Sequence, residues 1–282
     1  MASQDRFLLA GVMGYPVMHS RSPKLHNYWF EKHGLLGTYV PLAIQPDGLL
    51  AALRALPALG FAGCNITVPH KIAAMEAMAT IDPMAVRIGA INCVTVQKDG
   101  SLHGTNNDGF GYLESVRERF ADWRADAGPI VVLGAGGGAR AVVAALADAG
   151  APEIRLINRS RDKAEGIARD YGAPVVVHDW AQRAEALDGA AMLVNTTSLG
   201  MHGQPPLEIA LDRLPTQAVV SDIVYIPKET DLLAAARKRG NRTVNGLGML
   251  LNQARPAFQS WFGVLPEVTP ELRAMIEASI PA

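Results

Sequence analysis

The sequence has 282 residues, of which 49% are hydrophobic and 19% are charged, and its formal net charge is −1. This length is long for one hydrophobic core and comfortable for two, because domains cluster near about 100–150 residues. A net charge close to zero excludes the broad basic surface of nucleic-acid-binding and membrane-surface proteins, so neither nucleic acid nor a membrane is expected as a partner.

The cysteines and histidines show no metal-binding or disulfide pattern. Cys64 and Cys93 each lie in an apolar run, and neither C-x-x-C nor H-E-x-x-H spacing occurs. We therefore expect two buried thiols, no metal site and no disulfide framework. The amino-terminal stretch carries an acidic residue and has too short an apolar run for a secretory signal, and no segment approaches the ~18–20 apolar residues of a membrane helix. These features predict a cytoplasmic protein.

The first third of the chain alternates between strand and helix patterns. Strands are predicted over residues 6–14, 38–44 and 63–68, and helices over 22–34, 46–60 and 70–78. Ser22-Pro23 is typical of a helix start and Gly34 of a helix end. Residues 91–106 are predicted to form a hairpin that turns at Asp99-Gly100.

From Pro129 the alternation restarts more regularly. Residues 130–150 and 154–172 each predict a strand followed by a helix, 174–180, 191–198 and 218–225 predict strands, and 232–240 predicts a helix. The last helical segment, 246–263, is too apolar to stand alone, so we expect it to pack back on the first domain. This order predicts the α/β fold class with mainly parallel sheets.

The segment "VVLGAGGGARA" predicts a strand, a glycine-rich loop and the start of a helix. Gly134, Gly136 and Ala139 fit the G-x-G-x-x-G/A pattern, and the residues within the pattern are Ala135, Gly137 and Gly138. Glycine permits the tight turn and the close approach of a pyrophosphate, which the N–H groups and dipole of the helix start then bind. A purely structural glycine-rich turn is the alternative, but the flanking strand and helix favour a Rossmann-like dinucleotide domain.

The end of the following strand indicates which dinucleotide binds. Asn158, Arg159 and Ser160 occupy the place where an NAD-binding protein tends to carry Asp or Glu, and Lys163 follows one turn later. A carboxylate there accepts from the ribose 2′-hydroxyl, whereas a guanidinium attracts a 2′-phosphate. A basic surface turn is the plainer alternative, but its position after a dinucleotide loop favours NADP as the cofactor.

Three polar segments of the first third, "HSRSPKLHN", "CNITVPHK" and "AINCVTV…HGTNNDG", place hydrogen-bonding groups at the ends of apolar elements. Taken singly, they have structural explanations: Ser20 and Ser22 as helix caps, Lys71 as a solvated residue and Asp108 as a cap of the next helix. Taken together they predict a pocket for a small polyhydroxylated ligand.

The sequence resembles the shikimate dehydrogenase family over nearly the whole chain. The matching motifs occur in the family's order: "HSRSPKLHN", "NITVPHK", "GAINCV", "NNDG", "GAGGGARA", "NRS", "NTTSLGM", "DIVYIP" and "GLGMLLNQA". The resemblance implies an NADP-dependent oxidoreductase that interconverts 3-dehydroshikimate and shikimate by hydride transfer at C3.

The resemblance also implies roles for single residues. Lys71 and Asp108 would be the catalytic pair for proton transfer, and Ser20 and Ser22 would bind the substrate carboxylate. The other implied substrate contacts are Asn65, Thr67, Asn92, Tyr225 and Gln253, and the further cofactor-side residues are Asn195, Thr196, Thr197, Gly246 and Met249.

The implied domains are a substrate-binding catalytic domain, 1–108 with 246–282, and a Rossmann NADP-binding domain, 109–245. One position departs from the family pattern N-T-D-G: Asn107 replaces the threonine, which keeps hydrogen-bonding capacity but changes size and donor geometry. This change bears on substrate preference and on rate.

Several alternatives stay open. The chain could be a quinate or amino-shikimate dehydrogenase of the same family, or a non-catalytic NADP or metabolite sensor on the same scaffold, although a sensor does not need both Lys71 and Asp108. A folate-dependent dehydrogenase also pairs a lysine with a Rossmann domain but does not explain the S-x-S and NNDG segments. Lys71 and Asp108 could also lie apart on the surface. The oligomeric state is open, with a homodimer as one option.

Overall fold

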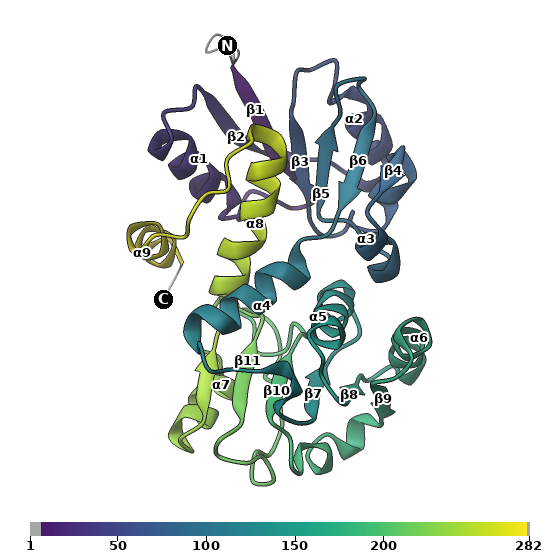
Figure 1. The fold of residues 1–282 in the computed structure, drawn as a ribbon, viewed down its shortest axis with the longest axis vertical. Coiled ribbons are helices and arrows are strands. Elements are labelled where there is room, and N and C mark those ends of the chain that lie inside the picture. Colours follow the sequence, from purple (N-terminus) through teal and green to yellow (C-terminus); the bar gives the residue numbers. More distant parts are fainter. Residues whose placement is uncertain (1–6, 281–282) are drawn as a thin grey trace. The chain divides into compact units, whose positions relative to one another are not determined.

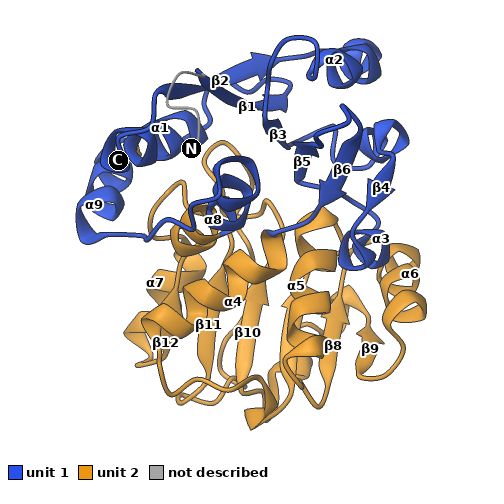
Figure 2. Cartoon of the chain, turned by 45° about the horizontal axis from the view of Figure 1, so that its top comes forward, with its two compact units in different colours: residues 1–107, 253–279 blue, residues 108–252, 280–282 orange. Residues whose placement is uncertain are grey.

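The computed structural model describes residues 7–280, which form two α/β units (Figures 1 and 2). Unit 1 comprises Met1–Asn107 and Gln253–Ser279, and unit 2 comprises Asp108–Asn252 and Ile280–Ala282. Each unit has its own sheet, with strand order β2-β1-β3-β5-β6-β4 in unit 1 and β12-β11-β10-β7-β8-β9 in unit 2. The predicted α/β fold class is confirmed.

The unit 1 sheet is mixed. Its strands are β1 (Leu8–Gly14), β2 (Gly37–Ala43), β3 (Gly63–Ile66), β4 (Thr80–Ile81), β5 (Cys93–Val96) and β6 (Leu102–Thr105). β1 pairs in parallel with β2 and β3, while β5 runs antiparallel to β3 and β6. Its helices are α1 (Ser22–Lys32), α2 (Leu49–Ala55), α3 (Pro83–Ile88), α9 (Pro270–Ala278) and part of α8 (Leu247–Phe262).

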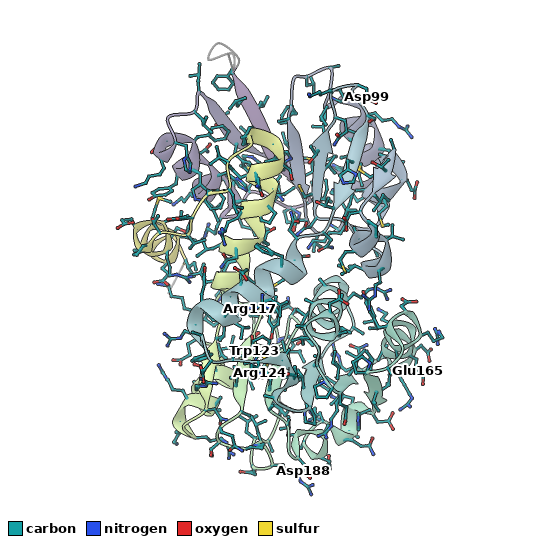
Figure 3. All side chains as sticks on the ribbon, viewed as in Figure 1. Asp99, Arg117, Trp123, Arg124, Glu165 and Asp188 are labelled. Carbon is teal, nitrogen blue, oxygen red and sulfur yellow. The ribbon has the colours of Figure 1, made fainter. Side chains whose placement is uncertain are left out.

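The predicted hairpin of β5 and β6 is confirmed. Asp99 lies in its turn, where its Oδ1 accepts from the backbone N–H of Ser101 at 2.9 Å (Figure 3). Gly100 follows at φ +83°, in the left-handed region that favours glycine. The strand predicted over 6–14 starts at Leu8 among the described residues, and Arg6 lies outside them.

The helix predicted over 70–78 is wrong, because this segment forms only a short 3₁₀ helix at Ala73–Ala77. Its turns close by bonds of the i→i+3 type, from Met75 N to Ile72 O and from Met78 N to Met75 O. The backbone of Ala79 then pairs with β6, so too few residues remain for an α-helix. Lys71 therefore lies in the turn before the 3₁₀ helix rather than at the start of an α-helix.

The carboxy-terminal helices pack on unit 1, as predicted for the apolar tail. Phe258 of α8 contacts the rings of Trp29 and Phe30 of α1, with ring centroids 5.5 Å apart in both pairs. The Trp261 indole N–H donates to Val94 O of β5 at 3.0 Å. These contacts bury aromatic surface that would otherwise face water, which accounts for the strongly apolar sequence of this helix.

The unit 2 sheet is parallel throughout. Its strands are β7 (Ile130–Leu133), β8 (Ile154–Ile157), β9 (Val175–His178), β10 (Met192–Asn195), β11 (Val219–Asp222) and β12 (Arg242–Val244). Its helices are α4 (Asp108–Arg119), α5 (Gly137–Asp148), α6 (Arg161–Tyr171), α7 (Asp231–Lys238) and the first turns of α8. The chain moves outward from β7 on one side through β8 and β9, and on the other through β10, β11 and β12. The strand order therefore reverses between β7 and β10, where ligands bind in sheets of this kind.

No helix within residues 7–280 is both long and apolar enough to span a membrane.

Candidate active site

The glycine loop follows β7 at the switch point of the unit 2 sheet. Gly134 has φ +114°, and a Cβ there would lie 2.5 Å from Thr196 Oγ1, so the turn and the neighbouring loop both require glycine. Gly136 and Gly137 are exposed, and a Cβ at either would meet no heavy atom within 4 Å. The start of α5 thus presents N–H groups to open space, an arrangement that fits a pyrophosphate.

The segment after β10 lies against this loop. Thr196 N and Thr196 Oγ1 both donate to Leu133 O, at 2.9 and 2.6 Å. Leu133 is the last residue of β7, so these bonds join the carboxyl ends of the two central strands. The predicted cofactor residues Gly134 and Thr196 are therefore neighbours in unit 2.

Asn195 has a supporting position rather than an open one. Its side chain is fully buried: Nδ2 donates to Leu199 O and Asp222 Oδ1, and Oδ1 accepts from the N–H and hydroxyl of Thr197. All of its polar atoms are therefore used in holding the loop that contains Thr197. Thr197 is half-buried, as is Met249 in the first turns of α8.

Asp222, at the end of β11, completes this network. Its Oδ1 also accepts from Val224 N at 3.0 Å, and its Oδ2 accepts from Thr230 Oγ1 at 2.8 Å. Burial raises the pKa of the Asp222 carboxyl to about 6, although these hydrogen bonds favour the charged form. The residues from 223 to 225, which include the half-buried Tyr225, are thereby tied to the end of β10.

The predicted 2′-phosphate residues lie where β8 ends and α6 begins. Arg159, Ser160 and Lys163 are exposed, and Asn158 Nδ2 donates to Ser160 O at 2.9 Å. Ile157 of β8 pairs with Leu133 of β7, so this turn lies on the strand next to the glycine loop. Two cationic side chains there can attract a phosphate.

In unit 1, Asn92 joins several of the predicted substrate residues. Its carbonyl accepts from Asn65 Nδ2 at 3.1 Å, and its Nδ2 donates to Gln253 Oε1 at 3.3 Å. Its Oδ1 accepts from Asn107 N at 2.9 Å, and Asp108 follows Asn107 directly in the chain. Asn92 is only 3% exposed, so this arrangement is fixed within the unit.

Lys71 is anchored beside Asn92 through its backbone. The carbonyl of Lys71 accepts from Ile91 N at 2.9 Å, and the carbonyl of the preceding Ala90 accepts from Asn106 Nδ2 at 2.9 Å. The residues on both sides of Asn92 are thus tied to the lysine segment and to the segment that leads into Asp108. The pairing of the Lys71 and Asp108 side chains stays a prediction.

The remaining predicted residues of unit 1 lie in two other loops. Thr67 N donates to Met13 O at 2.9 Å, which ties the residue after β3 to β1. Ser22 N donates to Ser20 Oγ at 3.2 Å, so the Ser20 side chain lies at the start of α1. The N-cap position itself is Arg21, which makes no side-chain cap hydrogen bond, so neither serine is the N-cap residue. Ser22 is buried at 7% exposure, and its side chain lies near the Tyr39 hydroxyl.

The sequence analysis assigns no role to two residues of these networks, Asp222 and Tyr39. Asp222 lies in the "DIVYIP" motif, and Tyr39 lies in the strand predicted over residues 38–44. Their only sequence signal is a polar atom within a run that is otherwise buried, where an unpaired polar group is costly.

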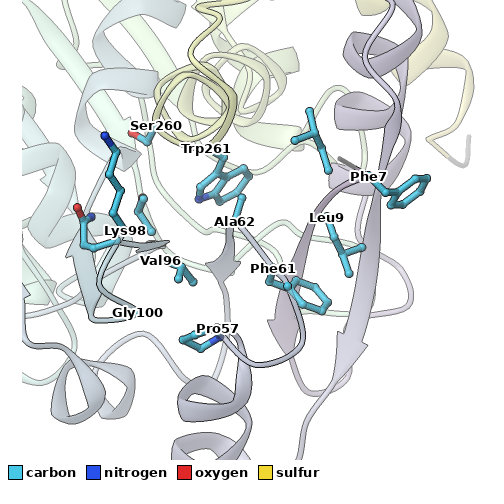
Figure 4. Close-up of a pocket in the computed structure, with 14 residues that line it drawn as sticks. Phe7, Leu9, Pro57, Phe61, Ala62, Val96, Lys98, Gly100, Ser260 and Trp261 are labelled. Atoms are coloured by element: carbon cyan, nitrogen blue, oxygen red, sulfur yellow. The ribbon is translucent and has the colours of Figure 1, made fainter. Parts of the chain in front are cut away.

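A hollow of about 350 Å³ lies elsewhere in unit 1 (Figure 4). It is lined by Phe61, Trp261 and Lys98 among others, near the amino ends of β1 and β3. None of the predicted substrate residues is among the described residues that line it. Within the described part of the chain, no group of three or more His, Cys, Asp or Glu side chains could hold a metal.

A parallel sheet with a glycine loop at its switch point, joined to a second α/β unit rich in buried amides, defines a two-unit dinucleotide-dependent oxidoreductase. Comparisons with known proteins agree. The family model for the shikimate dehydrogenase substrate binding domain matches residues 12–94, and the model for shikimate / quinate 5-dehydrogenase matches residues 115–202.

Individual relatives match over nearly the full length. The chain is 57% identical to the shikimate dehydrogenase (NADP(+)) of Paramagnetospirillum magneticum, with 95% of this chain and 97% of that protein covered. A crystal structure of shikimate 5-dehydrogenase from Thermus thermophilus in complex with NADP(H) and shikimate matches with a TM-score of 0.85 and 34% identity, covering 97% and 98% of the two chains. Quinate dehydrogenase from Corynebacterium glutamicum in complex with NAD matches with a TM-score of 0.88 and 28% identity, covering 97% and 98%. The chain therefore belongs to the shikimate dehydrogenase family.

Proposed function

We propose that this chain catalyses the reversible, NADP-dependent interconversion of 3-dehydroshikimate and shikimate. The observation that carries the proposal is the cluster around Asn92, which joins Asn65, Gln253 and Asn107 by hydrogen bonds within one unit. Such a concentration of buried and half-buried amides suits a small polyhydroxylated ring. The relatives at 48–57% identity, which bear the name shikimate dehydrogenase (NADP(+)), support the same substrate.

The coenzyme site fits NADP by its donor set. Open space over Gly136 and Gly137 accommodates a pyrophosphate, and Arg159 with Lys163 supplies positive charge for a 2′-phosphate. When bound, NADPH supplies the hydride that reduces the carbonyl carbon C3.

Lys71 carries the proton chemistry in this proposal. As hydride adds to C3, the carbonyl oxygen gains negative charge, and the Lys71 ammonium donates a hydrogen bond and then the proton to that oxygen. The Asp108 carboxylate orients the lysine and the resulting hydroxyl. In the reverse direction, Lys71 accepts the hydroxyl proton as the hydride leaves C3, so atoms and charge balance in both directions.

The substrate carboxylate is assigned to Ser20 and Ser22, and the ring hydroxyls to the amides and hydroxyls of Asn65, Thr67, Asn92, Tyr225 and Gln253.

A cytoplasmic location is supported by the two buried free thiols, Cys64 and Cys93, which suit a reducing compartment. The homodimer can be tested by light scattering of the purified protein. A homodimer predicts a molar mass twice that of one chain.

Steady-state kinetics test this function, with shikimate, quinate and amino-shikimate each assayed against NADP⁺ and NAD⁺ by the absorbance of the reduced coenzyme. The proposal expects the highest kcat/KM for shikimate with NADP⁺. A preference for quinate would favour the alternative that the chain is a quinate dehydrogenase, an activity named for one of the similar structures. Binding of NADP⁺ without turnover of any of the three would favour a sensor.

A further inference from the structure

Tyr39 lies in β2, and its hydroxyl reaches two residues of the proposed substrate site. The Tyr39 hydroxyl donates to Asn65 Oδ1 at 2.8 Å, and the Ser22 side chain lies close enough to it to lower the pKa of the phenol. Tyr39 is 1% exposed, so all three groups meet away from bulk water. They come from separate elements of unit 1: Ser22 begins α1, Tyr39 lies in β2 and Asn65 lies in β3.

The chemistry of these groups fixes the direction of each bond. A carboxamide oxygen only accepts, so the single proton of the Tyr39 hydroxyl goes to Asn65. The same bond fixes the orientation of the Asn65 amide, because Oδ1 faces Tyr39 while Nδ2 donates to Asn92 O at 3.1 Å.

Helix α1 holds the tyrosine through two further side chains. The Asn27 amide brackets the Tyr39 backbone, since Oδ1 accepts from Tyr39 N at 2.8 Å and Nδ2 donates to Tyr39 O at 3.1 Å. The His26 ring stacks on the Tyr39 ring, with centroids 4.1 Å apart and planes 6° from parallel. Ser22 and His26 are four residues apart and share one face of the helix. The motif "HSRSPKLHN" thus contains His26 and Asn27, which contact Tyr39, as well as the two serines.

The His26 ring is buried and neutral. Desolvation lowers the pKa of His26 to about 3, which the nearby Asn65 side chain only partly offsets. A neutral ring adds no charge beside the substrate carboxylate. His26 therefore contributes flat packing against Tyr39 without competing with the anion-binding serines.

We propose that Tyr39 is a positioning residue of this site, whose hydroxyl orients the Asn65 carboxamide through its hydrogen bond and whose ring end limits the rotation of the neighbouring Ser22 side chain, so that both can bind the ring substrate. The proposal rests on the proposed function, because it takes Ser22 and Asn65 as substrate contacts. Removing the hydroxyl leaves Asn65 Oδ1 buried without its donor and lets the amide and the serine rotate. The energetic cost falls on substrate binding, because Tyr39 lies wholly within unit 1, whereas the coenzyme residues of the glycine loop lie in unit 2.

Tyr39→Phe tests this by removing one oxygen. We expect the KM for shikimate to rise about tenfold, the size of one lost hydrogen bond to a buried polar group, with the KM for NADP⁺ unchanged and kcat within about threefold. The matched control is Tyr112→Phe, which removes another buried phenol hydroxyl, one that donates to Met192 Sδ at 3.8 Å and lies near Ser221, both in unit 2. That control should leave both KM values unchanged. Thermal unfolding of each variant checks that it folds.

A double-mutant cycle with Ser22→Ala supplies the second measurement. If Tyr39 acts through Ser22, the double variant raises the KM for shikimate by less than the product of the two single effects. A KM for shikimate within twofold of the parent in Tyr39→Phe, or an equal rise in both KM values, would overturn the proposal. If the parent itself does not turn over shikimate, the proposed function fails first and this inference fails with it.

Discussion

Asn195 and Asp222 face each other as paired residues of β10 and β11, and Asn195 Nδ2 donates to Asp222 Oδ1 at 3.0 Å. This bond joins the loop that carries Thr196 and Thr197 to the segment that leads to Tyr225. A single buried carboxylate therefore holds segments of unit 2 for which the family resemblance implies coenzyme and substrate contacts.

The Asp222 carboxyl predicts a specific pH dependence of stability. Its pKa is about 6 in the folded protein and 3.8 as an ordinary carboxyl, so between these values the folded chain keeps a proton that the unfolded chain has lost. The contribution of this group to the free energy of unfolding thus decreases as the pH rises from 4 to 6, by up to about 1.4 kcal/mol per pH unit, and is constant above pH 6.

Asp222→Asn removes this titration while keeping an acceptor for Val224 N. Urea unfolding of the parent and the variant between pH 4 and pH 8 measures the difference. The parent is expected to lose stability relative to the variant as the pH rises to 6. A difference that is independent of pH would mean that the carboxyl titrates normally.

The buried His26 of unit 1 should change the free energy of unfolding with pH in the opposite direction to Asp222. Its pKa is about 3 in the folded protein against 6.5 for an ordinary imidazole, so between these values the unfolded chain binds the extra proton. Stability from this site is fully present above pH 6.5 and is lost as the pH falls towards 3. His26→Phe keeps a ring against Tyr39 and should flatten the acid side of the stability curve. Equal acid slopes in the parent and this variant would contradict the assignment.

Gly246 and Gly137 predict opposite effects of the same substitution. A Cβ at Gly246 would lie 1.9 Å from Ile223 O, a backbone atom, so Gly246→Ala should lower the free energy of unfolding by about 3 kcal/mol. Gly137→Ala meets no heavy atom within 4 Å and places a better helix former in α5, so its stability should equal or slightly exceed that of the parent. The affinity of Gly137→Ala for NADP⁺, measured by calorimetry, should nevertheless decrease, because the methyl group enters the space left for the pyrophosphate. Unchanged affinity would place the coenzyme elsewhere.

Arg159 should determine the preference for NADP⁺ over NAD⁺. Loss of a charge-assisted contact to the 2′-phosphate costs about 1.5–3 kcal/mol, so Arg159→Ala should weaken NADP⁺ binding roughly 10- to 150-fold and NAD⁺ binding hardly at all. Arg169→Ala, an exposed arginine in the last turn of α6, the helix that follows Arg159, is the matched control and should affect neither coenzyme. Equal weakening of both coenzymes by Arg159→Ala would rule out the phosphate role.

The sequence predicted the long elements well because their signals are local. The repeated strand–helix pattern of unit 2 and the glycine loop after β7 depend on short-range periodicity, and both are present in the structure. β4 has two residues and α3 has six, and neither is long enough to show a period. The segment at 70–78 has helical composition, but its pairing with β6 at Ala79 limits it to a 3₁₀ turn.

Site prediction had a different limit. Motifs indicated Asn65, Asn92 and Gln253, and the structure joins these through Asn92. Tyr39 and Asp222 remained hidden because each acts through partners distant in sequence, Asn65 and Asn195, and no local pattern encodes such a contact. Asn195 itself was grouped with the coenzyme residues, whereas its side chain is fully used in holding Thr197 and Asp222.

The most direct test of the central claim, that Lys71 transfers the proton in this site, is the turnover number of Lys71→Ala with shikimate and NADP⁺. The account predicts a decrease in kcat of about 10²- to 10⁴-fold, as for a lost general acid–base, with NADP⁺ affinity unchanged. Lys98→Ala, an exposed lysine of the β5–β6 hairpin, should retain the turnover of the parent. A Lys71→Ala variant that turns over within a few-fold of the parent would contradict the account.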